Sequence, residues 1–175
     1  MSFFLGIDNG VSGCVAVLET GQRSKTKITL FDTPIVIVKI GNKKRKRYNI
    51  NVLADFFKQF PAGDTFAVIE SPIAMPKQSS TSTLSTGIGF GLYQGIMSMQ
   101  LIAYESVHPK RWQKEFGIIG DTKSMAFQIA SRLFPDQVFS TPRDRLLDGR
   151  CDAILMAEYG CRKKRGELQR TLEVK

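Results

Sequence analysis

The chain has 175 residues, 42% of them hydrophobic, which suits one folded domain with a sizeable core and argues against a largely disordered chain. Lys and Arg number 25 against 16 Asp and Glu, so the formal net charge is +9, and this excess points to a polyanionic partner, either nucleic acid or an anionic membrane surface. We favour nucleic acid because the positive charge is clustered. A basic surface that only keeps the protein soluble is the alternative.

The cellular location is expected to be a reducing compartment. No apolar run approaches the roughly 20 residues of a membrane-spanning helix, and the first residues lack the features of a signal or transit peptide. Cys14, Cys151 and Cys161 have no metal-like spacing and are expected to be plain thiols. These features predict a cytoplasmic protein without a membrane partner, and an organelle also fits them.

The first fifty residues predict three antiparallel strands and a basic tip. Apolar or alternating runs bounded by turn residues occupy residues 3–8, 14–19 and 25–33. Pro34 interrupts this pattern, and an extended run follows it. Residues 43–47 are all Lys or Arg, so we expect a loop or hairpin tip outside the core.

The rest of the chain alternates helix and strand patterns, which predicts an α/β architecture with a mixed sheet flanked by helices. An amphipathic helix with Asn51 as its N-cap is expected first, then a buried strand, then a polar, flexible segment at residues 72–87. The regular elements from that helix onward are expected at residues 51–60, 65–71, 88–100, 101–107, 109–117, 121–135 and 145–160. The domain is expected to cover residues 1–162, with a charged tail at 163–175.

Two carboxylates four residues apart begin the last predicted helix. Asp148 can cap the helix or stabilise its positive end, and this structural role is sufficient to explain it. Asp152 directly precedes the apolar run AILMA, and a carboxylate next to the core needs a partner. This stretch alone leaves a structural and a functional interpretation equally open.

Two further acids, Asp8 and Glu70, each end an apolar strand, and adjacent strands would bring them together. If the last helix packs over the same sheet end, Asp148 and Asp152 join them. Four such carboxylates repel one another unless cations lie between them, and oxygen-only ligands favour Mg²⁺ or Mn²⁺. Two such ions can activate water and stabilise the leaving oxygen of a phosphodiester, so a basic protein with this cluster is predicted to be a nuclease.

Six stretches of the chain occur in the order found in RuvC-like Holliday-junction resolvases of the retroviral-integrase/RNase H superfamily. They are FLGIDNGVSG, FAVIESP, GIGFGLYQG, VHPKRWQKEFGI, KSMAFQIASRLFP and DGRCDAILMAEYG. The resemblance covers most of residues 3–160 and is closest to the chloroplast-type resolvase of plants and its bacterial and phage relatives, in which the last two acids are also four residues apart. The second acid is typically Glu in that branch, whereas this chain has Asp152, which is one methylene shorter.

The resemblance implies an RNase H-like five-stranded mixed sheet, its first three strands antiparallel, with helices on both faces. It also implies a homodimer that makes paired symmetric nicks in four-way DNA junctions, with two Mg²⁺ ions per active site and Mn²⁺ as a substitute. The expected location is the cytoplasm of a bacterium or of a phage-infected host cell. Asp8 would bridge the two ions, Glu70 and Asp148 would each complete one shell, and Asp152 would bind a metal directly or through water. Lys123 would stabilise charge near the scissile phosphate, and an ordinary surface lysine is the alternative.

The basic run is a candidate for contact with DNA phosphates, which would give affinity and salt dependence without sequence choice. Its residues are Lys43, Lys44, Arg45, Lys46 and Arg47. A solvated hairpin tip is the alternative. We favour DNA contact because the rest of the protein is also basic.

Two other segments are candidates for DNA contact. Lys110 and Arg111 begin a helix whose dipole alone would favour acids, which hints at a phosphate partner. In resolvases the segment after the second acid enters the junction centre, so Ile73 or Met75 could wedge against an unstacked base and Lys77 could contact phosphate. An exposed loop with incidental apolar residues explains each of these residues equally well.

Other functions remain open from the sequence. A junction-binding protein without catalysis would fit the charge, and an RNase H or transposase-like nuclease would share the metal chemistry. A phosphotransferase of the actin/sugar-kinase superfamily shares a GIDNG-type first hairpin but needs two such domains. The glycine-rich GIGFGLYQG lacks the features of a P-loop, so we expect no nucleotide cofactor and favour close helix packing at a dimer interface. Trp112 is expected in the core, and His108 is expected to have a structural or DNA-backbone role.

Overall fold

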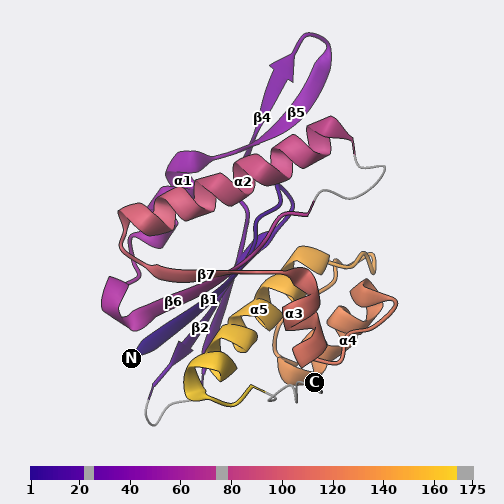
Figure 1. Cartoon of the computed structure of the whole chain (residues 1–175). Helices are drawn as coiled ribbons and strands as arrows, with labels where there is room; N and C mark the ends of the chain where they lie inside the picture. Colours follow the sequence, from indigo (N-terminus) through magenta and orange to yellow (C-terminus); the bar gives the residue numbers. More distant parts are fainter. Residues whose placement is uncertain (22–25, 74–78, 169–175) are drawn as a thin grey trace, which may run out of the picture.

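The computed structural model describes residues 1–21, 26–73 and 79–168 (Figure 1), so the predicted contacts of Met75 and Lys77 lie outside the described residues. The central sheet has five strands in the order β3 (Lys27–Asp32), β2 (Cys14–Thr20), β1 (Ser2–Asp8), β6 (Thr65–Glu70) and β7 (Ala103–Val107). The first three strands pair antiparallel, whereas β6 runs parallel to β1 and β7 parallel to β6. The predicted mixed sheet is therefore confirmed.

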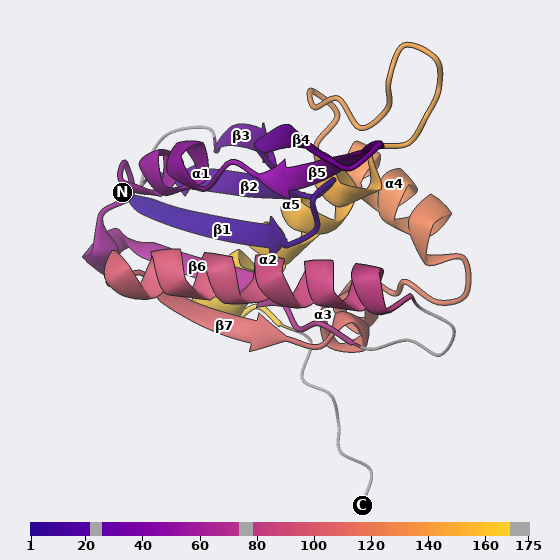
Figure 2. The same ribbon diagram turned by 90° about the horizontal axis from the view of Figure 1, so that it is seen from above.

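Helices cover both faces of the sheet, as Figure 1 and the view from above in Figure 2 show. One face carries α1 (Ile50–Phe57) and α2 (Ser80–Met99), and a short 3₁₀ turn at Ala62–Asp64 leads into β6. The other face carries α3 (Pro109–Glu115), α4 (Thr122–Leu133) and α5 (Asp148–Arg165). In the described part of the chain, no helix combines the length and apolar character that spanning a bilayer would require.

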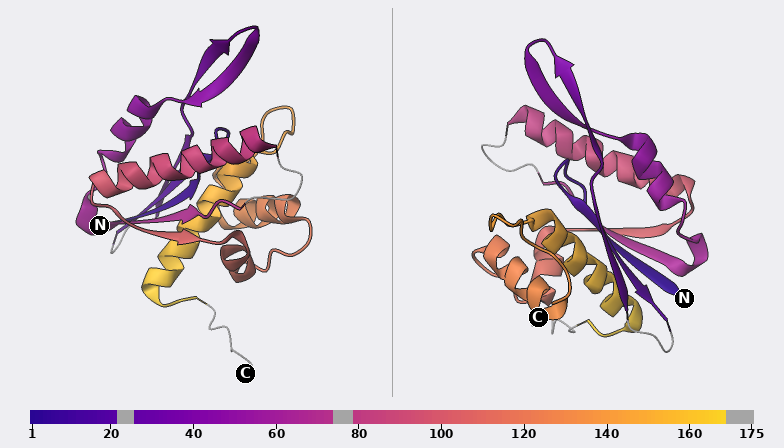
Figure 3. Two further views of the ribbon diagram at one scale, coloured as in Figure 1. Left: turned by 45° about the horizontal axis from the view of Figure 1, so that its top comes forward. Right: turned by 180° about the vertical axis from the view of Figure 1, so that it is seen from behind.

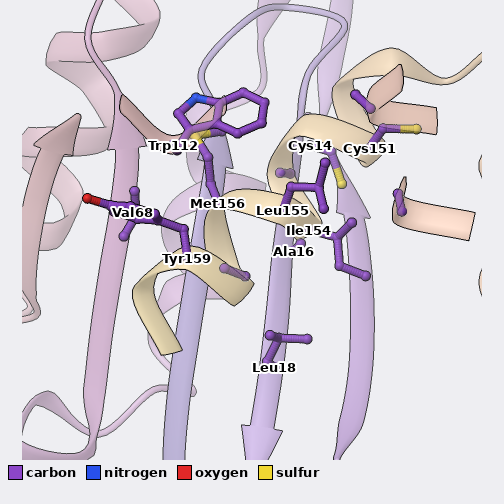
Figure 4. Packing of buried hydrophobic residues seen from close by; sticks show 14 of the residues in the cluster. Cys14, Ala16, Leu18, Val68, Trp112, Cys151, Ile154, Leu155, Met156 and Tyr159 are labelled. Carbon is purple, nitrogen blue, oxygen red and sulfur yellow. The ribbon is translucent and has the colours of Figure 1, made fainter. Parts of the chain in front are cut away.

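The alternation of side chains along each strand divides the interior into two cores. Leu5 and Ile7 of β1 point into the core beneath α1 and α2, whereas Phe4 lies in the core beneath α5. Figure 4 shows the second core, in which Cys14, Ala16 and Leu18 of β2 lie near Ile154 and Leu155 of α5. All three cysteines are free thiols, as expected, and all three are buried.

Helix α5 lies directly on β1 because β1 has a glycine at the crossing point. A Cβ atom at Gly6 would lie 1.9 Å from the carbonyl oxygen of Ala153 and 2.3 Å from the backbone nitrogen of Ala157. No side chain fits at this distance without moving the helix. The contact fixes how far α5 stands from the sheet and therefore where its first turn lies.

The basic run lies in a hairpin outside the core, as expected, but its residues form a strand and not the tip. Strand β5 (Lys43–Tyr48) pairs antiparallel with β4 (Ile35–Ile40), and together they form a two-stranded sheet, the β4–β5 arm, which projects from the body (Figures 1 and 3). Every basic residue of the run faces an apolar residue or Lys39 across the pair. The partner strand supplies the backbone hydrogen bonds, and exposure of both faces lets the charges stay in water.

Several element borders also differ from the predicted ones. Helix α2 begins at Ser80, eight residues before its expected start, because the hydroxyl of Ser79 accepts a hydrogen bond from the Ser82 backbone N–H and caps the helix. Asn49 caps α1 in place of Asn51. Helix α5 runs from Asp148 to Arg165, whereas residues 145–160 were expected for it.

The substitution Gly6→Ala tests the contact between α5 and β1. We expect it to lower the free energy of unfolding by about 1–3 kcal/mol or more, because the added methyl overlaps the helix backbone. Urea denaturation monitored by circular dichroism measures the change as a shift of the midpoint. Gly63→Ala is the matched control, because nothing lies within 4 Å of a Cβ at that position. Equal midpoints for the two variants would contradict the packing.

Candidate active site

Two acidic side chains meet at one edge of the sheet because β1 and β6 are parallel neighbours. Ile7 pairs with Ile69, so Asp8 and Glu70 follow at the carboxyl ends of adjacent strands. The Gly10 backbone N–H donates a hydrogen bond of 3.1 Å to Oδ1 of Asp8. The turn between β1 and β2 therefore holds this carboxylate at the sheet edge.

The first turn of α5 contacts the same edge. A Cβ atom at Gly149 would lie 2.7 Å from Oδ2 of Asp8 and 2.9 Å from the Cα atom of Gly13. A glycine at this position thus lets the helix end approach the β1–β2 turn. Asp148 is the first residue of the helix, and Asp152 follows one turn later at the border of the core.

The carboxylates of these residues affect one another electrostatically, which shows that they are close. Burial raises the pKa of Asp8 to about 6, against the opposing hydrogen bond from Gly10, and Asp148 adds to the rise. Burial also raises the pKa of Glu70 to about 7, and Asp8 contributes. The pKa of Asp152 lies well above its ordinary value because the residue is buried and faces Asp8, Glu70 and Asp148. The structure therefore brings the four predicted acids together.

Lys123, at the start of α4, lies at the mouth of this cluster. Its Nζ atom donates a hydrogen bond of 2.7 Å to Oδ2 of Asp148, and both side chains are accessible to solvent. The bond lowers the pKa of Asp148 and raises the pKa of Lys123. The one predicted catalytic cation is thus placed beside the predicted acids.

An open cavity of about 280 Å³ lies in front of these groups, and we call it the carboxylate cavity. Three elements contribute its walls: the β1–β2 turn, the first turns of α5 and the N-terminal half of α2. The lining residues are Asp8, Gly10, Val11, Ser12, Gly13, Ser82, Ser85, Thr86, Asp148, Gly149 and Asp152. The part of α2 involved, which we expected to be a flexible segment, is helical and forms one wall.

The chemistry of the four acids suits a hard divalent cation, because each offers only carboxylate oxygens and a cation would relieve their repulsion. In this conformation, however, no three His, Cys, Asp or Glu side chains among the described residues converge on one metal position. Asp148 instead accepts a hydrogen bond from Lys123. Carboxylate oxygens therefore suit Mg²⁺ as ligands, but that the four acids bind one metal site together stays a prediction.

Three residues that sequence reasoning did not assign to the site position its groups. The indole N–H of Trp112 donates a hydrogen bond of 3.0 Å to Oε1 of Glu70 and orients that carboxylate. The side-chain amide of Asn9 donates to the backbone carbonyl of Glu70 at 3.0 Å, and the Tyr48 hydroxyl donates to the carbonyl of Asn9 at 2.9 Å. Trp112 lies in the core as predicted, but no local pattern could show its bond to a residue 42 positions away.

The remaining predicted DNA contacts lie outside the carboxylate cavity. The five basic residues stand on the β4–β5 arm, and Ile73 is exposed shortly after Glu70. Lys110 is exposed at the start of α3, whereas Arg111 lies 3.6 Å from Glu105. His108 caps α3, since its Nδ1 atom accepts a hydrogen bond from the Lys110 backbone N–H, which fits the expected structural role.

The raised pKa values predict that the acid cluster opposes folding at neutral pH. An acid whose pKa is raised in the folded state binds more protons there than in the unfolded state, so the free energy of unfolding falls as pH rises from about 4 to 7. We expect Asp152→Asn to be more stable than the wild type at pH 8 in EDTA, by on the order of 1–3 kcal/mol, and this advantage to shrink towards pH 4.

Urea denaturation at several pH values measures this difference. The matched control is Asp64→Asn, which removes an exposed carboxylate at the opposite end of β6 and should leave stability nearly unchanged. An Asp152→Asn protein that is no more stable than the wild type at pH 8 would show that the cluster does not oppose folding.

The fold is similar to that of solved RuvC structures, although no family model and no curated protein matches the sequence. One is RuvC of Thermus thermophilus in complex with a Holliday junction substrate, with a TM-score of 0.55 and 11% sequence identity. Another structure of Thermus thermophilus RuvC has a TM-score of 0.56 and 10% identity. In both cases the match covers 94% of this chain and 97% of the RuvC chain, so nearly the whole of each molecule is involved. At this level of identity the likeness establishes the architecture, and the chain has the RuvC-like form of the RNase H fold.

Proposed function

We propose that the chain is a metal-dependent endonuclease that resolves four-way DNA junctions by paired, symmetric nicks. One observation carries this proposal: four acidic side chains from β1, β6 and α5 meet at one sheet end of a RuvC-like fold. A site that only binds DNA gains nothing from buried acids, because they repel phosphate. The strongly basic composition supports a nucleic-acid substrate, and the similar RuvC has been seen with a Holliday junction.

In this proposal Asp8, Glu70, Asp148 and Asp152 hold two Mg²⁺ ions. The ions would supply activation of the attacking water and stabilisation of charge on the phosphodiester. The chain's own contribution is to place the carboxylates before substrate arrives. Trp112 holds one oxygen of Glu70 and leaves the other for a cation, and the Gly10 N–H orients Asp8 in the same way.

Lys123 has a separate part in this mechanism. Its side chain is largely exposed, and its Nζ atom lies at the edge of the acid cluster through the bond to Asp148. If Asp148 held a cation, the ammonium group of Lys123 would be free to turn to a phosphate oxygen of the substrate. A fixed positive charge there would stabilise the transition state of phosphodiester cleavage.

The β4–β5 arm is proposed to contact DNA phosphates, and its base is linked to the acid cluster. The Thr33 backbone N–H donates to the carbonyl of Gly13 at 2.9 Å, just before β4 begins, and the Tyr48 hydroxyl donates to Asn9 at the end of β5. Both acceptors belong to the β1–β2 turn that also holds Asp8. DNA bound along the arm would therefore be presented to the carboxylates in a fixed position.

We also propose that two copies of the chain associate through α2. One exposed side of this helix carries apolar side chains and glycines: Leu84 is 64% and Met99 is 84% exposed, and nothing lies within 4 Å of a Cβ at Gly87, Gly91 or Gly95. Glycines four residues apart let a second helix approach closely, and a contiguous exposed apolar surface marks an interaction site. A two-fold dimer would present two equal sites to the equivalent strands of a junction.

The substitution Asp8→Asn tests the catalytic proposal. With a labelled synthetic four-way junction and Mg²⁺, the wild type is expected to give paired nicks, and the variant to lose activity by at least about 1,000-fold while still binding the junction. Asp64→Asn is the control for loss of an acid elsewhere. Nicking that continues in EDTA would contradict the metal requirement.

The same assay separates the other candidate functions. A linear duplex and an RNA–DNA hybrid serve as competing substrates for the wild type. Preference for the hybrid would indicate an RNase H, and binding without cleavage of any substrate would indicate a junction-binding protein.

The substitution Gly91→Arg tests the dimer. Sedimentation at micromolar concentration is expected to show a wild-type dimer and a monomeric variant, with association weakened by at least about 100-fold because an unpaired buried charge costs several kcal/mol. Gly63→Arg adds the same charge at another open glycine and should leave the dimer intact. A dimeric Gly91→Arg protein would place the interface elsewhere.

A further inference from the structure

A second cavity of about 240 Å³ adjoins the carboxylate cavity. The two share a wall formed by Val11, Ser12 and Gly13 of the β1–β2 turn and by Asp148 and Gly149 of α5. Its far side is built from the end of β3, from strand β5 and from the loop between α4 and α5, so we call it the β5-side cavity. An extended ligand could therefore occupy both cavities at once.

Three of the charged residues that line the β5-side cavity take part in ion pairs. Asp32 is bound by Arg150 through two hydrogen bonds of 2.7 and 2.6 Å, and Asp148 is bound by Lys123. The other charged lining residues, Lys46 and Arg145, have no ion-pair partner among the residues that the structure describes. The cavity is thus suited to an anion, although two acids lie in its wall.

The parts of the chain that carry these two cations are held in place. Arg145 closes a short turn, in which its backbone N–H donates to the Thr141 hydroxyl at 3.2 Å and its carbonyl accepts from the Thr141 backbone N–H at 2.9 Å. Arg150 ties the loop to the sheet, because it also donates to the Val138 carbonyl at 3.1 Å. Lys46 stands on β5 two residues before Tyr48, which anchors the arm to Asn9.

We propose that the β5-side cavity binds the phosphodiester group next to the one at the carboxylates, with Lys46 and Arg145 as its cationic contacts. A phosphodiester fits better than a free phosphate because the cavity adjoins the catalytic one and shares lining residues with it, and DNA carries a negative charge at every nucleotide. This inference rests on the proposed function, since it takes the carboxylate cavity as the place where DNA is cut. It assigns one residue of the basic run to the site itself, and adds Arg145, which no sequence pattern indicated.

Titration of isotope-labelled protein with the phosphorylated dinucleotide pTpT in EDTA tests the proposal without need for cleavage. We expect saturable changes in the amide NMR signals of Ser12, Gly13 and Gly149, and about tenfold weaker binding for Lys46→Gln and for Arg145→Gln, since each removes a charged hydrogen bond. Inorganic phosphate alone should bind more weakly than pTpT. A dinucleotide with an uncharged methylphosphonate linkage should bind the wild type and the two variants equally.

A matched variant removes the same charge close by. Arg143→Gln changes the same loop at an exposed residue outside the cavity lining. This variant should change pTpT binding by less than about twofold. If Arg143→Gln weakens binding as much as Lys46→Gln and Arg145→Gln do, the losses reflect the net charge of the protein and the proposed subsite is wrong.

Binding to a four-way junction separates this inference from the proposed function. Lys46→Gln and Arg145→Gln should each lower the slope of log affinity against log salt concentration by about one, as expected for one lost phosphate contact. A wild type that binds pTpT as described but cuts no junction would overturn the function and leave the subsite standing. Junction cleavage with unchanged affinity, salt slope and pTpT binding in both variants would overturn the subsite alone.

Discussion

The position of the acid cluster depends on the direct contact between α5 and β1. Gly6 lets the helix backbone rest on the strand, and Gly149 lets the first helical turn meet the β1–β2 turn at Asp8. A larger residue at either position would lift the helix and carry Asp148 and Asp152 away from the sheet edge. The two glycines thus allow Asp148 and Asp152 to lie near Asp8, although 140 residues or more separate them from it in the chain.

This arrangement has an electrostatic cost that the surrounding residues only partly offset. Burial and mutual repulsion raise the pKa values of Asp8, Glu70 and Asp152, so their charged forms are disfavoured in the folded protein. The hydrogen bond from the Gly10 N–H stabilises the charged form of Asp8, and the bond from the Trp112 indole stabilises that of Glu70. Strain of this kind is common at functional sites, and the divalent cations of the proposed function would relieve much of the repulsion.

The sequence allowed the acids to be predicted because their signal is local. Asp8 and Glu70 each end an apolar run, and the parallel pairing of those runs is enough to bring them together. The arm could not be predicted in the same way, since a run of five basic residues carries no information about the partner strand that makes it a strand. The early start of α2 was missed for a related reason. Ser and Thr are poor helix formers, and whether Ser79 caps a helix depends on backbone geometry that the sequence does not show. The bond from Trp112 to Glu70 joins two distant elements and leaves no periodic trace.

The hydrogen bonds at its base connect the β4–β5 arm, where we propose that DNA binds, with the acid cluster. Thr33 and Tyr48, at the two ends of the arm, both bind backbone carbonyls of the β1–β2 turn, so the arm cannot swing without disturbing the residues that hold Asp8. Gly89 permits this contact, because a Cβ there would lie 2.3 Å from the Tyr48 hydroxyl and 2.2 Å from the Asn9 carbonyl. Helix α2 carries Gly89 and also the exposed Gly87, Gly91 and Gly95, so it joins the proposed dimer face to the arm and the cavity. In the proposed dimer each copy would hold its site in a rigid frame, which suits the coordinated cutting of two opposed strands of a junction.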